Sequence, residues 1–244
     1  TSLITRSQRQ ARAALSAYKW IATLPADRPI DAPLILDIHR RMIEGADEDH
    51  CPPGRLRERD QNVVFGVPPH RGAEGGSDCS QALDALVYAI NHDFHGHDPL
   101  VRALIAHYHI AAMHPFLDGN GRTARALEAL MLQRSGLRDA LFIAMSNYYY
   151  DEKPNYLKAL SSVPATNGDL TGFLIFGLKG IETQTKRLAG MLRENISKEL
   201  YRSMMHDFYT RLSGRKRVLG ERHLTLANHL LNHGKTEFIL LMKA

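Results

Sequence analysis

Twelve consecutive residues, HPFLDGNGRTAR at positions 114–125, combine a titratable base, a carboxylate, two glycines and two arginines. The glycines on either side of Asn120 allow positive φ, so successive backbone N–H groups can point into one concavity. A helix beginning at Arg122 adds its free N–H groups and the positive end of its dipole. Arg122 and Arg125 are three apart and therefore lie on one side of that helix. Together these features predict a cradle for a polyphosphate.

The residues before the glycines supply groups that phosphate chemistry needs. Asp118 is a hard oxygen ligand beside the expected phosphates, where a Mg²⁺ ion bridging phosphate oxygens would be held. His114 ends the preceding helix, and a neutral imidazole there could take a proton from an incoming hydroxyl. Phe116 and Leu117 interrupt the polar set, so we expect them to anchor the loop in the core. We also count Phe116 among the nucleotide-binding residues.

Three better-known nucleotide motifs fit these residues less well. A P-loop needs four residues between its glycines and a lysine after the second, and both are missing here. GNGRTA satisfies the dinucleotide pattern G-x-G-x-x-A, but that pattern follows an apolar strand, whereas LIAHYHIAAM is helical and HPFLD is polar. The glycine-rich loop of kinases needs strands on both sides and fails likewise.

Apolar residues at helical spacing dominate the chain and predict an all-α fold that positions this motif. In order, the predicted helices cover residues 7–24, a segment capped by Asp31, a segment capped by Ser80, a run from Asp98 to His114, a run from the Gly-Asn-Gly turn to Gly136, residues near 151–161, and roughly 169–212 with Asp169 as its cap. Residues 51–76 are rich in Pro and Gly and contain one β-like run, NVVFGV. They predict an ordered loop or a short β-hairpin over the helices.

The composition changes after residue 212, which predicts two segments. Residues 1–212 read as the helical catalytic domain. A basic linker, RLSGRKRVLGERH at residues 211–223, leads into residues 213–244, which continue with an amphipathic run and an apolar end. This segment resembles the first part of a winged-helix module cut short. A helix and a strand docked on the main bundle explain it equally well.

The bulk composition is that of an ordinary globular protein with a basic balance. The 244 residues are 44% hydrophobic and 23% charged, with a net charge of +5 that favours acidic partners such as nucleotides or nucleic acid. Cys51 and Cys79 form no C-x-x-C pair, so they predict neither a zinc ribbon nor a disulfide scaffold. No apolar run approaches a membrane span and no signal peptide opens the chain, so we expect a cytoplasmic protein.

Three histidines near the motif invite a metalloenzyme interpretation that helical geometry opposes. On one helix His107 and His109 point about 200° apart, and His107 and His114 stand about 10 Å apart along the axis. His107 shares the face of Leu100 and Leu104, which predicts a hydrogen-bonded core histidine. His92, His95 and His97 at a helix end would suit its dipole.

Residues 114–125 resemble the signature of the Fic family, H-x-F-x-[DE]-G-N-G-R-x-x-R, at every specified position. The preceding A-x-x-H-x-x-x-x-x-x-H helix agrees with it, as does the upstream stretch PGRLR…NVVFG, which is similar to the family's flap. The resemblance covers roughly residues 7–210. It implies the mainly helical Fic fold, with a short β-hairpin flap.

The resemblance implies a protein adenylyltransferase, which transfers AMP from MgATP to a Ser, Thr or Tyr hydroxyl of a protein and releases pyrophosphate. His114 would be the general base and Asp118 would hold Mg²⁺ between the α- and β-phosphates. The backbone of Gly119, Asn120 and Gly121 would form the anion nest. In the same carry-over, Arg122 would hold the phosphates and Arg125 would reach the γ-phosphate. Phosphorylating relatives depart from the motif in the glycine region, and this sequence does not.

The target protein and the adenine base are assigned by the same resemblance. In similar proteins the flap pairs with a backbone strand of the target, which makes Val63, Val64 and Phe65 the flap candidates. Adenine is held by a Tyr and an Asn downstream of the motif, and Tyr156 and Asn167 lie near the expected positions. The spacing to Asn167 is some three residues longer than expected.

Other functions and partners stay open at this point. One alternative is a nucleotide- or DNA-binding regulator without catalysis, using the cradle or the basic segment 211–223. Another is a Fic-type transferase of a different phosphate-containing group. Intact His114 and Asp118 favour the enzyme, because phosphate binding alone needs neither. We expect a protein substrate, self-modification, DNA contact through the C-terminal segment, and, since similar proteins are often dimers, a homodimer.

Many similar proteins carry an inhibitory [ST]-x-x-x-E-[GN] helix, whose Glu pairs with the second motif arginine. Glu44, Glu74 and Glu194 are each followed by Gly or Asn, but none has Ser or Thr four positions earlier. Either Thr5 stands at the Glu position or the motif ended just before Thr1. Both cases leave Arg125 without that carboxylate, so we expect activity without an activator.

Overall fold

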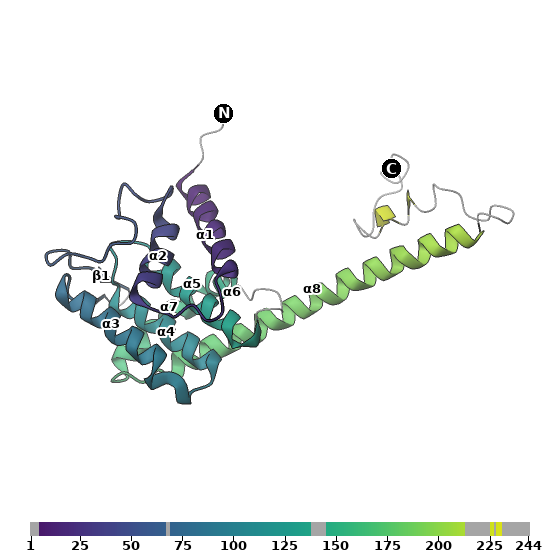
Figure 1. The fold of residues 1–244 in the computed structure, drawn as a ribbon. Coiled ribbons are helices and arrows are strands. Elements are labelled where there is room, and N and C mark those ends of the chain that lie inside the picture. Colours follow the sequence, from purple (N-terminus) through teal and green to yellow (C-terminus); the bar gives the residue numbers. More distant parts are fainter. Residues whose placement is uncertain (1–4, 67–68, 138–144, 213–224, 227, 231–244) are drawn as a thin grey trace. The chain divides into compact units, whose positions relative to one another are not determined.

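The structure is a computed structural model that describes residues 5–66, 69–137, 145–212, 225–226 and 228–230. Contacts divide the chain into two units, Thr1–Thr185 and Lys186–Ala244. The helices and strands are α1 Arg6–Thr23, α2 Ala32–Ile43, β1 Val64–Phe65, β2 His70–Arg71, α3 Ser77–Asn91, the short 3₁₀ helix η1 Asp93–Gly96, α4 Pro99–Met113, α5 Asn120–Leu132, the wide turn η2 Gln133–Leu137, α6 Met145–Asp151, α7 Lys153–Ala165 and α8 Thr171–Leu212. The all-α prediction is confirmed (Figure 1).

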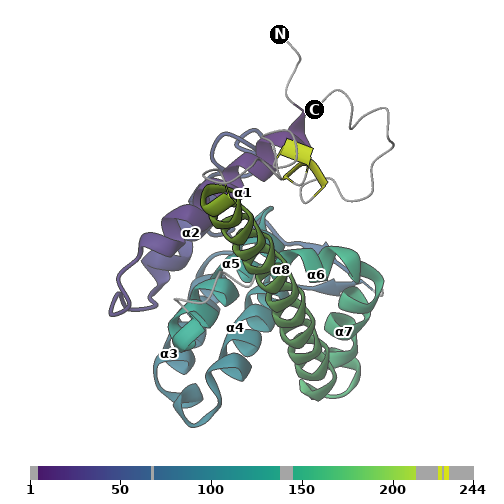
Figure 2. The ribbon, with the colours of Figure 1, turned by 90° about the vertical axis from the view of Figure 1, so that its right-hand side faces the viewer.

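The core of the first unit is built on α4 and α5, which lie side by side (Figures 1 and 2). Both helices are buried on most of their circumference, and α5 buries the polar residues Asn120, Thr123 and Glu128 as well as its apolar ones. The helices α1 and α2 pack on α5, and α3 packs on α4. Gly177 of α8 allows close approach to α4, because a Cβ there would come within 2.5 Å of Leu104.

Most predicted caps are confirmed. The Asp31 side chain accepts from the Leu34 N–H at 2.8 Å, and the Asp98 side chain accepts from the Leu100 N–H at 2.8 Å. Proline follows each of them in the first helical turn. The Asp169 carboxylate accepts from the Thr171 N–H at 2.8 Å. Because these side chains satisfy otherwise unpaired N–H groups, they set where the helices begin.

Two predicted helix boundaries are wrong. The helix α3 begins at Ser77 rather than after Ser80, and its N-cap is Gly76, whose φ of 82° suits glycine. The helix predicted near 151–161 corresponds to α7, Lys153–Ala165, and the helix α6 that precedes it was not predicted. Pro154 has no N–H to continue α6, but it fits the first turn of a new helix.

Residues 51–76 form the predicted loop with a minimal hairpin. The strands β1 and β2 pair antiparallel, with Val64 opposite Arg71 and Phe65 opposite His70. The C-terminal segment predicted as a partial winged helix lies almost entirely outside the described residues. In the described part of the second unit, residues 186–212 continue α8 and expose apolar side chains, including Ile196, Leu200 and Met204. No helix among the described residues is long and apolar enough to cross a membrane.

Candidate active site

His114 follows the last residue of α4 in a left-handed backbone conformation, with φ 48° and ψ 61°. That conformation is uncommon outside glycine, and non-glycine examples gather at functional sites. The imidazole Nδ1 lies 2.6 Å from the carbonyl oxygen of Ala111. A carbonyl can only accept, so Nδ1 carries the proton and the lone pair of the neutral ring is on Nε2. The geometry therefore prepares His114 to accept a proton at Nε2.

Arg57 fastens the loop before the hairpin to the end of α4. Its guanidinium is fully buried and donates to the carbonyl oxygens of His114 at 2.7 Å, Gln61 at 2.6 Å and Ala73 at 2.5 Å. The Ala73 N–H donates in turn to Met113 O at 2.9 Å. The planar fork of donors on arginine suits several carbonyls at once. Arg57 thus positions the backbone of His114 and the base of the hairpin together.

The loop between His114 and α5 is held from inside by Asn120 and Phe116. The Asn120 side chain accepts from the Phe116 N–H at 2.9 Å and donates to the Phe116 carbonyl at 2.8 Å. The Phe116 ring is fully buried and stacks on His39, with centroids 3.6 Å apart. The prediction that Phe116 anchors the loop in the core is confirmed. Its inclusion among the nucleotide-binding residues stays a prediction.

Gly119 is the N-cap of α5 and adopts the left-handed conformation, with φ 79° and ψ 2°. A Cβ at this position would also lie 2.7 Å from Cδ1 of Ile43. No side chain caps the first turn of α5, so its N–H groups are available at the positive end of the helix dipole. The positive φ predicted for the two glycines is found at Gly119 alone, since Gly121 lies inside α5, and the helix N-terminus supplies the geometry that suits an anion.

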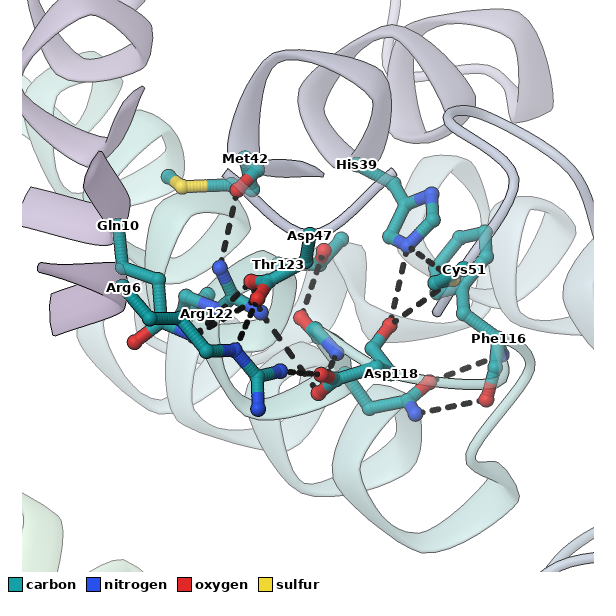
Figure 3. Close-up of polar contacts among 12 residues, drawn as sticks. Arg6, Gln10, His39, Met42, Asp47, Cys51, Phe116, Asp118, Arg122 and Thr123 are labelled. Carbon is teal, nitrogen blue, oxygen red and sulfur yellow. Dashed lines mark hydrogen bonds and ion pairs between the residues drawn. The ribbon is translucent and has the colours of Figure 1, made fainter. Parts of the chain in front are cut away.

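Asp118 and Arg122 belong to a charged cluster with Arg6 and Asp47 (Figure 3). The Arg122 guanidinium lies 2.7 Å from the fully buried Asp47 carboxylate and donates to Met42 O at 3.0 Å. Arg6 of α1 bridges Asp47 at 2.6 Å and Asp118 at 3.0 Å. Burial raises the pKa of Asp47, but hydrogen bonds from its neighbours outweigh burial and lower it to about 2. Arg122 is thereby oriented toward the turn after α2, and its contact with phosphates stays a prediction.

His39 of α2 holds the backbone of Asp118 through a hydrogen bond (Figure 3). Its Nδ1 accepts from the Gly54 N–H at 3.0 Å, so the proton of the neutral ring is on Nε2, 3.1 Å from the Asp118 carbonyl. Burial lowers the pKa of His39 to about 4, because a charged imidazole would lose its hydration there. His39 is therefore a neutral, doubly hydrogen-bonded support.

A cavity of about 240 Å³ lies beside the motif, and residues from the hairpin, the motif and α7 line it together. Its lining includes Phe65 from the hairpin, His114, Gly121 and Arg125 from the motif, and Tyr156 from α7. The cavity combines a base, a helix N-terminus, a guanidinium and an aromatic ring. These are the features of a site for a nucleotide's phosphates and base.

The hairpin reaches over His114. The Phe65 ring stacks on the His114 imidazole, with centroids 3.5 Å apart and an interplanar angle of 16°. The Val63 carbonyl accepts from the Gly72 N–H at 3.3 Å, and the Val64 side chain is 68% exposed. Phe65 therefore faces the cavity, while Val64 is accessible from solvent.

Tyr156 and Asn167 have different surroundings. Tyr156 is buried at the edge of the cavity, and its hydroxyl lies 2.9 Å from Nε2 of His107. Asn167 is an exposed residue in a left-handed turn after α7, outside the cavity lining. The predicted core role of His107 is confirmed, since it is fully buried and bonded on both ring nitrogens.

The four supporting residues Arg57, Asp47, His39 and Glu128 were absent from the sequence-based assignment of the site. All four are buried polar groups, and none belongs to the twelve-residue motif. One signal was available for Glu128, which lies one helical turn after Arg125. The other three come from loops and from α2, so only the folded chain brings them to the motif.

Comparison with known proteins points to the same family as the twelve-residue motif. The Fic/DOC family model matches residues 29–132. Protein adenylyltransferase fic-1 of Caenorhabditis elegans is 33% identical over 162 residues, which cover 65% of this chain and 28% of that protein. Protein adenylyltransferase Fic of Drosophila willistoni is 30% identical over 164 residues, covering 66% and 30%. This chain spans less than a third of the length of these curated relatives.

Solved structures share the fold. A structure of Fic-1 from C. elegans superposes with a TM-score of 0.63 at 26% identity, covering 79% of this chain and 54% of that chain. A Fic family protein from Desulfovibrio desulfuricans gives a TM-score of 0.64 at 22% identity, covering 76% and 54%, and supports the fold alone. The motif, the family match and the fold agree, and we conclude that this chain belongs to the Fic/DOC family through residues 29–132.

Proposed function

We propose that this chain is a protein adenylyltransferase that transfers AMP from MgATP to a Ser, Thr or Tyr hydroxyl of a protein. The observation that carries the proposal is one cavity lined by His114, Gly121, Arg125 and Tyr156, in which His114 has its basic nitrogen at Nε2. Curated relatives named protein adenylyltransferase support the same activity.

The proposed step is an in-line displacement at the α-phosphorus of ATP. Nε2 of His114 takes the proton of the target hydroxyl, and the hydroxyl oxygen forms a new bond to the α-phosphorus. The bond from the α-phosphorus to the oxygen bridging to the β-phosphate breaks, and pyrophosphate leaves. The N–H groups at the start of α5, with its dipole, stabilise the negative charge on the phosphates. Arg125 meets the γ-phosphate.

Asp118 is the residue that would hold Mg²⁺. The fit is acceptable, because Mg²⁺ in nucleotide sites typically uses one or two carboxylates and completes its shell with phosphate oxygens and water. The Asp118 side chain is 41% exposed and lies beside the α5 N-terminus, within reach of solvent. When bound, the ion would neutralise phosphate charge and favour departure of pyrophosphate. Arg6 contacts the same carboxylate and would have to yield one oxygen to the ion.

The hairpin is proposed as the surface that aligns the protein target. Val64 is exposed at the short strand β1, where an extended segment could add a strand by backbone hydrogen bonds. Phe65 lies on the other side, stacked on His114. A target bound along Val63, Val64 and Phe65 would therefore pass next to the general base. Tyr156 is proposed to contact the adenine, and Asn167 stays a prediction.

Three predictions from the sequence, on DNA contact, dimerisation and cellular location, go beyond these observations. DNA contact was predicted for residues 213–244, which lie almost entirely outside the described part of the chain. A homodimer and a cytoplasmic location also stay predictions. Residues 1–212 are kept as the proposed catalytic domain.

Replacing the general base tests the proposal against a binding protein without catalysis. His114→Ala should abolish AMP transfer and leave the ATP affinity within about threefold, since a general base contributes to the chemical step rather than to affinity. Transfer is measured with ATP labelled at the α-phosphate, and affinity by calorimetry. The matched control is His92→Ala, an exposed histidine at the end of α3 that should leave both unchanged. Undiminished transfer by His114→Ala would refute the assignment.

A further inference from the structure

A second cavity lies at the end of α4 and α5 opposite to the motif, and the proposed chemistry does not use it. Its volume is about 310 Å³, and its lining comes from the loop between α1 and α2, the end of α3, η1, the start of α4 and the end of α5 with η2. Arg102 in this lining and His114 stand about 18 Å apart along the axis of α4. We call it the arginine cavity, and it is separate from the candidate active site.

Arginines from three different elements line the arginine cavity: Arg28 of the loop between α1 and α2, Arg102 of α4 and Arg134 of η2. Among the described lining residues, Asp27 alone carries a carboxylate, and it is exposed to screening by water. The N-terminal end of α4 and the C-terminal ends of α3 and α5 all border the cavity, so their helix dipoles oppose one another. The arginines therefore set the sign of the charge, which suits an anion.

Arg102 keeps donors that no described residue accepts. Its Nη2 donates to the carbonyl oxygen of Ile90 at 3.1 Å, which holds the guanidinium against the end of α3. Within the part of the chain that the structure describes, Arg102 forms no ion pair, and its Nε atom is buried without a hydrogen-bond partner. A buried donor of a charged group costs free energy while it stays unpaired. An anion in the arginine cavity would accept from this guanidinium and balance its charge.

The other two arginines are positioned by weaker contacts. The Arg134 Nη2 donates to the carbonyl oxygen of Pro25 at 3.3 Å, next to the loop that carries Arg28. Arg28 lies 3.3 Å from the Asp31 carboxylate, and both side chains are 35% exposed. So exposed an ion pair contributes little, and Arg28 can turn to a ligand at low cost. Planar guanidiniums approaching from several sides match the oxygens of a phosphate group.

The floor of the arginine cavity is apolar. Ile30, Ile90 and Met131 line it and are at most 7% exposed. Asn91 holds this floor together, because its Nδ2 donates to the carbonyl oxygens of Ile30 and Val87 at 2.8 Å each. An inorganic anion has no group to place on such a floor, whereas an organic anion has one.

We propose that the arginine cavity binds a small phosphate ester. The phosphate is held by the three arginines, and its organic group lies on the apolar floor. The proposal does not depend on AMP transfer, because the cavity shares no residue with the candidate active site.

The test follows the Nε–H signals of the arginines by ¹⁵N NMR of the full chain while phenyl phosphate is added. The Arg102 signal is the one that disappears in Arg102→Lys, and Arg134→Lys assigns Arg134 in the same way. Phenyl phosphate should shift both signals along one saturable curve with half-saturation below about 1 mM. Inorganic phosphate lacks the ring and should bind about threefold more weakly or worse. Benzyl alcohol lacks the phosphate and should leave both signals unchanged.

Substitutions in the cavity are compared with a matched surface change. Arg102→Gln and Arg134→Gln should each weaken phenyl phosphate about tenfold, the effect of one hydrogen bond to a charged group, read from the arginine that remains. Arg12→Gln removes the same charge from an exposed position of α1 and should leave the dissociation constant unchanged. Because either cavity variant reports on the site, the test holds even if the other does not fold.

Four results would overturn the proposal. One is a shift of the Arg102 signal that grows without saturating, and another is an equal shift from sodium chloride at the same ionic strength, since both indicate general screening. A third is equal weakening by Arg12→Gln and Arg102→Gln, which would show an effect of net charge alone. The last is equal affinity for inorganic and phenyl phosphate, which would overturn the assignment of an ester. Each result is read at the cavity, so loss of AMP transfer changes none of them.

Discussion

Replacing Asp47 by Asn should destabilise the fold far more than replacing an exposed carboxylate that forms a single ion pair. Asp47 is fully buried in the turn after α2 and holds Arg6 and Gln10 of α1 together with Arg122 of α5. Its pKa falls from 3.8 to about 2, since the hydrogen bonds outweigh the opposing effect of burial. That difference corresponds to about 2.5 kcal/mol favouring the charged form in the folded state. Loss of a charged partner for the mostly buried Arg122 adds on the order of 1 kcal/mol.

The measurement is urea unfolding at pH 7, followed by the fluorescence of Trp20 on α1 and by circular dichroism as a second probe. Asp47→Asn should lower the free energy of unfolding by about 3 kcal/mol. The matched control is Asp37→Asn, whose ion pair with Arg40 at 2.8 Å is 38% and 48% exposed and should contribute less than about 1 kcal/mol.

The pH dependence supplies a second check on Asp47. A carboxyl whose folded pKa is depressed stabilises the protein above its unfolded value near 3.8, and this contribution is lost as the pH falls through about 2. The wild type should therefore lose this stability between about pH 4 and 2, and Asp47→Asn should not. A loss under about 1 kcal/mol in Asp47→Asn at pH 7, or an equal loss in Asp37→Asn, would show that the Asp47 contacts do not stabilise the fold.

Three further changes test the supports of the motif. The pKa of His39 is about 4 in the folded state against 6.5 unfolded, so protonation of the unfolded state should remove about 1.4 kcal/mol of stability per pH unit from pH 6.5 down to 4. The urea midpoint of His39→Gln should not change with pH in this way. An unchanged pH dependence in His39→Gln would contradict the assignment of this effect to His39. Gly119→Ala should lower the free energy of unfolding by about 1–3 kcal/mol, from backbone strain and from a clash of the new Cβ with Ile43. Adding Ile43→Val should restore part of this stability in thermal melts, and no restoration would exclude the clash. Arg57→Lys should lower the free energy of unfolding by about 2 kcal/mol and slow AMP transfer, because one ammonium cannot reach all the carbonyls that the guanidinium joins. AMP transfer at the wild-type rate would argue against a role of Arg57 in positioning His114.

The helical fold and the cavity-facing part of the motif could be predicted from sequence because both are local. Apolar spacing and the caps Asp31 and Asp98 define helices within a few residues of themselves. The backbone preference predicted for the Gly-Asn-Gly turn is confirmed at Gly119, whereas Gly121 is helical. A boundary failed where a residue outside the apolar pattern decided it, because Gly76 starts α3 at Ser77 rather than after Ser80.

The supports of the site could not be predicted, because they depend on contacts between distant segments. Asp47 meets Arg122 across 75 positions of sequence, and Arg57 meets the carbonyl of His114 across 57. A charged residue in a loop is usually solvated, so no local pattern marks these two as buried. The ion pair of Arg122 could not be predicted for the same reason: its type and spacing indicate a phosphate ligand, and only the fold brings the Asp47 carboxylate to it.

AMP transfer is distinguished from phosphate transfer, and from binding alone, by which phosphate of ATP becomes attached to protein. The chain is incubated in parallel with ATP labelled at the α-phosphate and at the γ-phosphate, with Mg²⁺ and a cell lysate, and protein-bound label is counted after denaturation. Stable labelling is expected from the α-phosphate alone, on target protein and on the chain itself, and none with His114→Ala. Label transferred from the γ-phosphate, or no label from either, would contradict it.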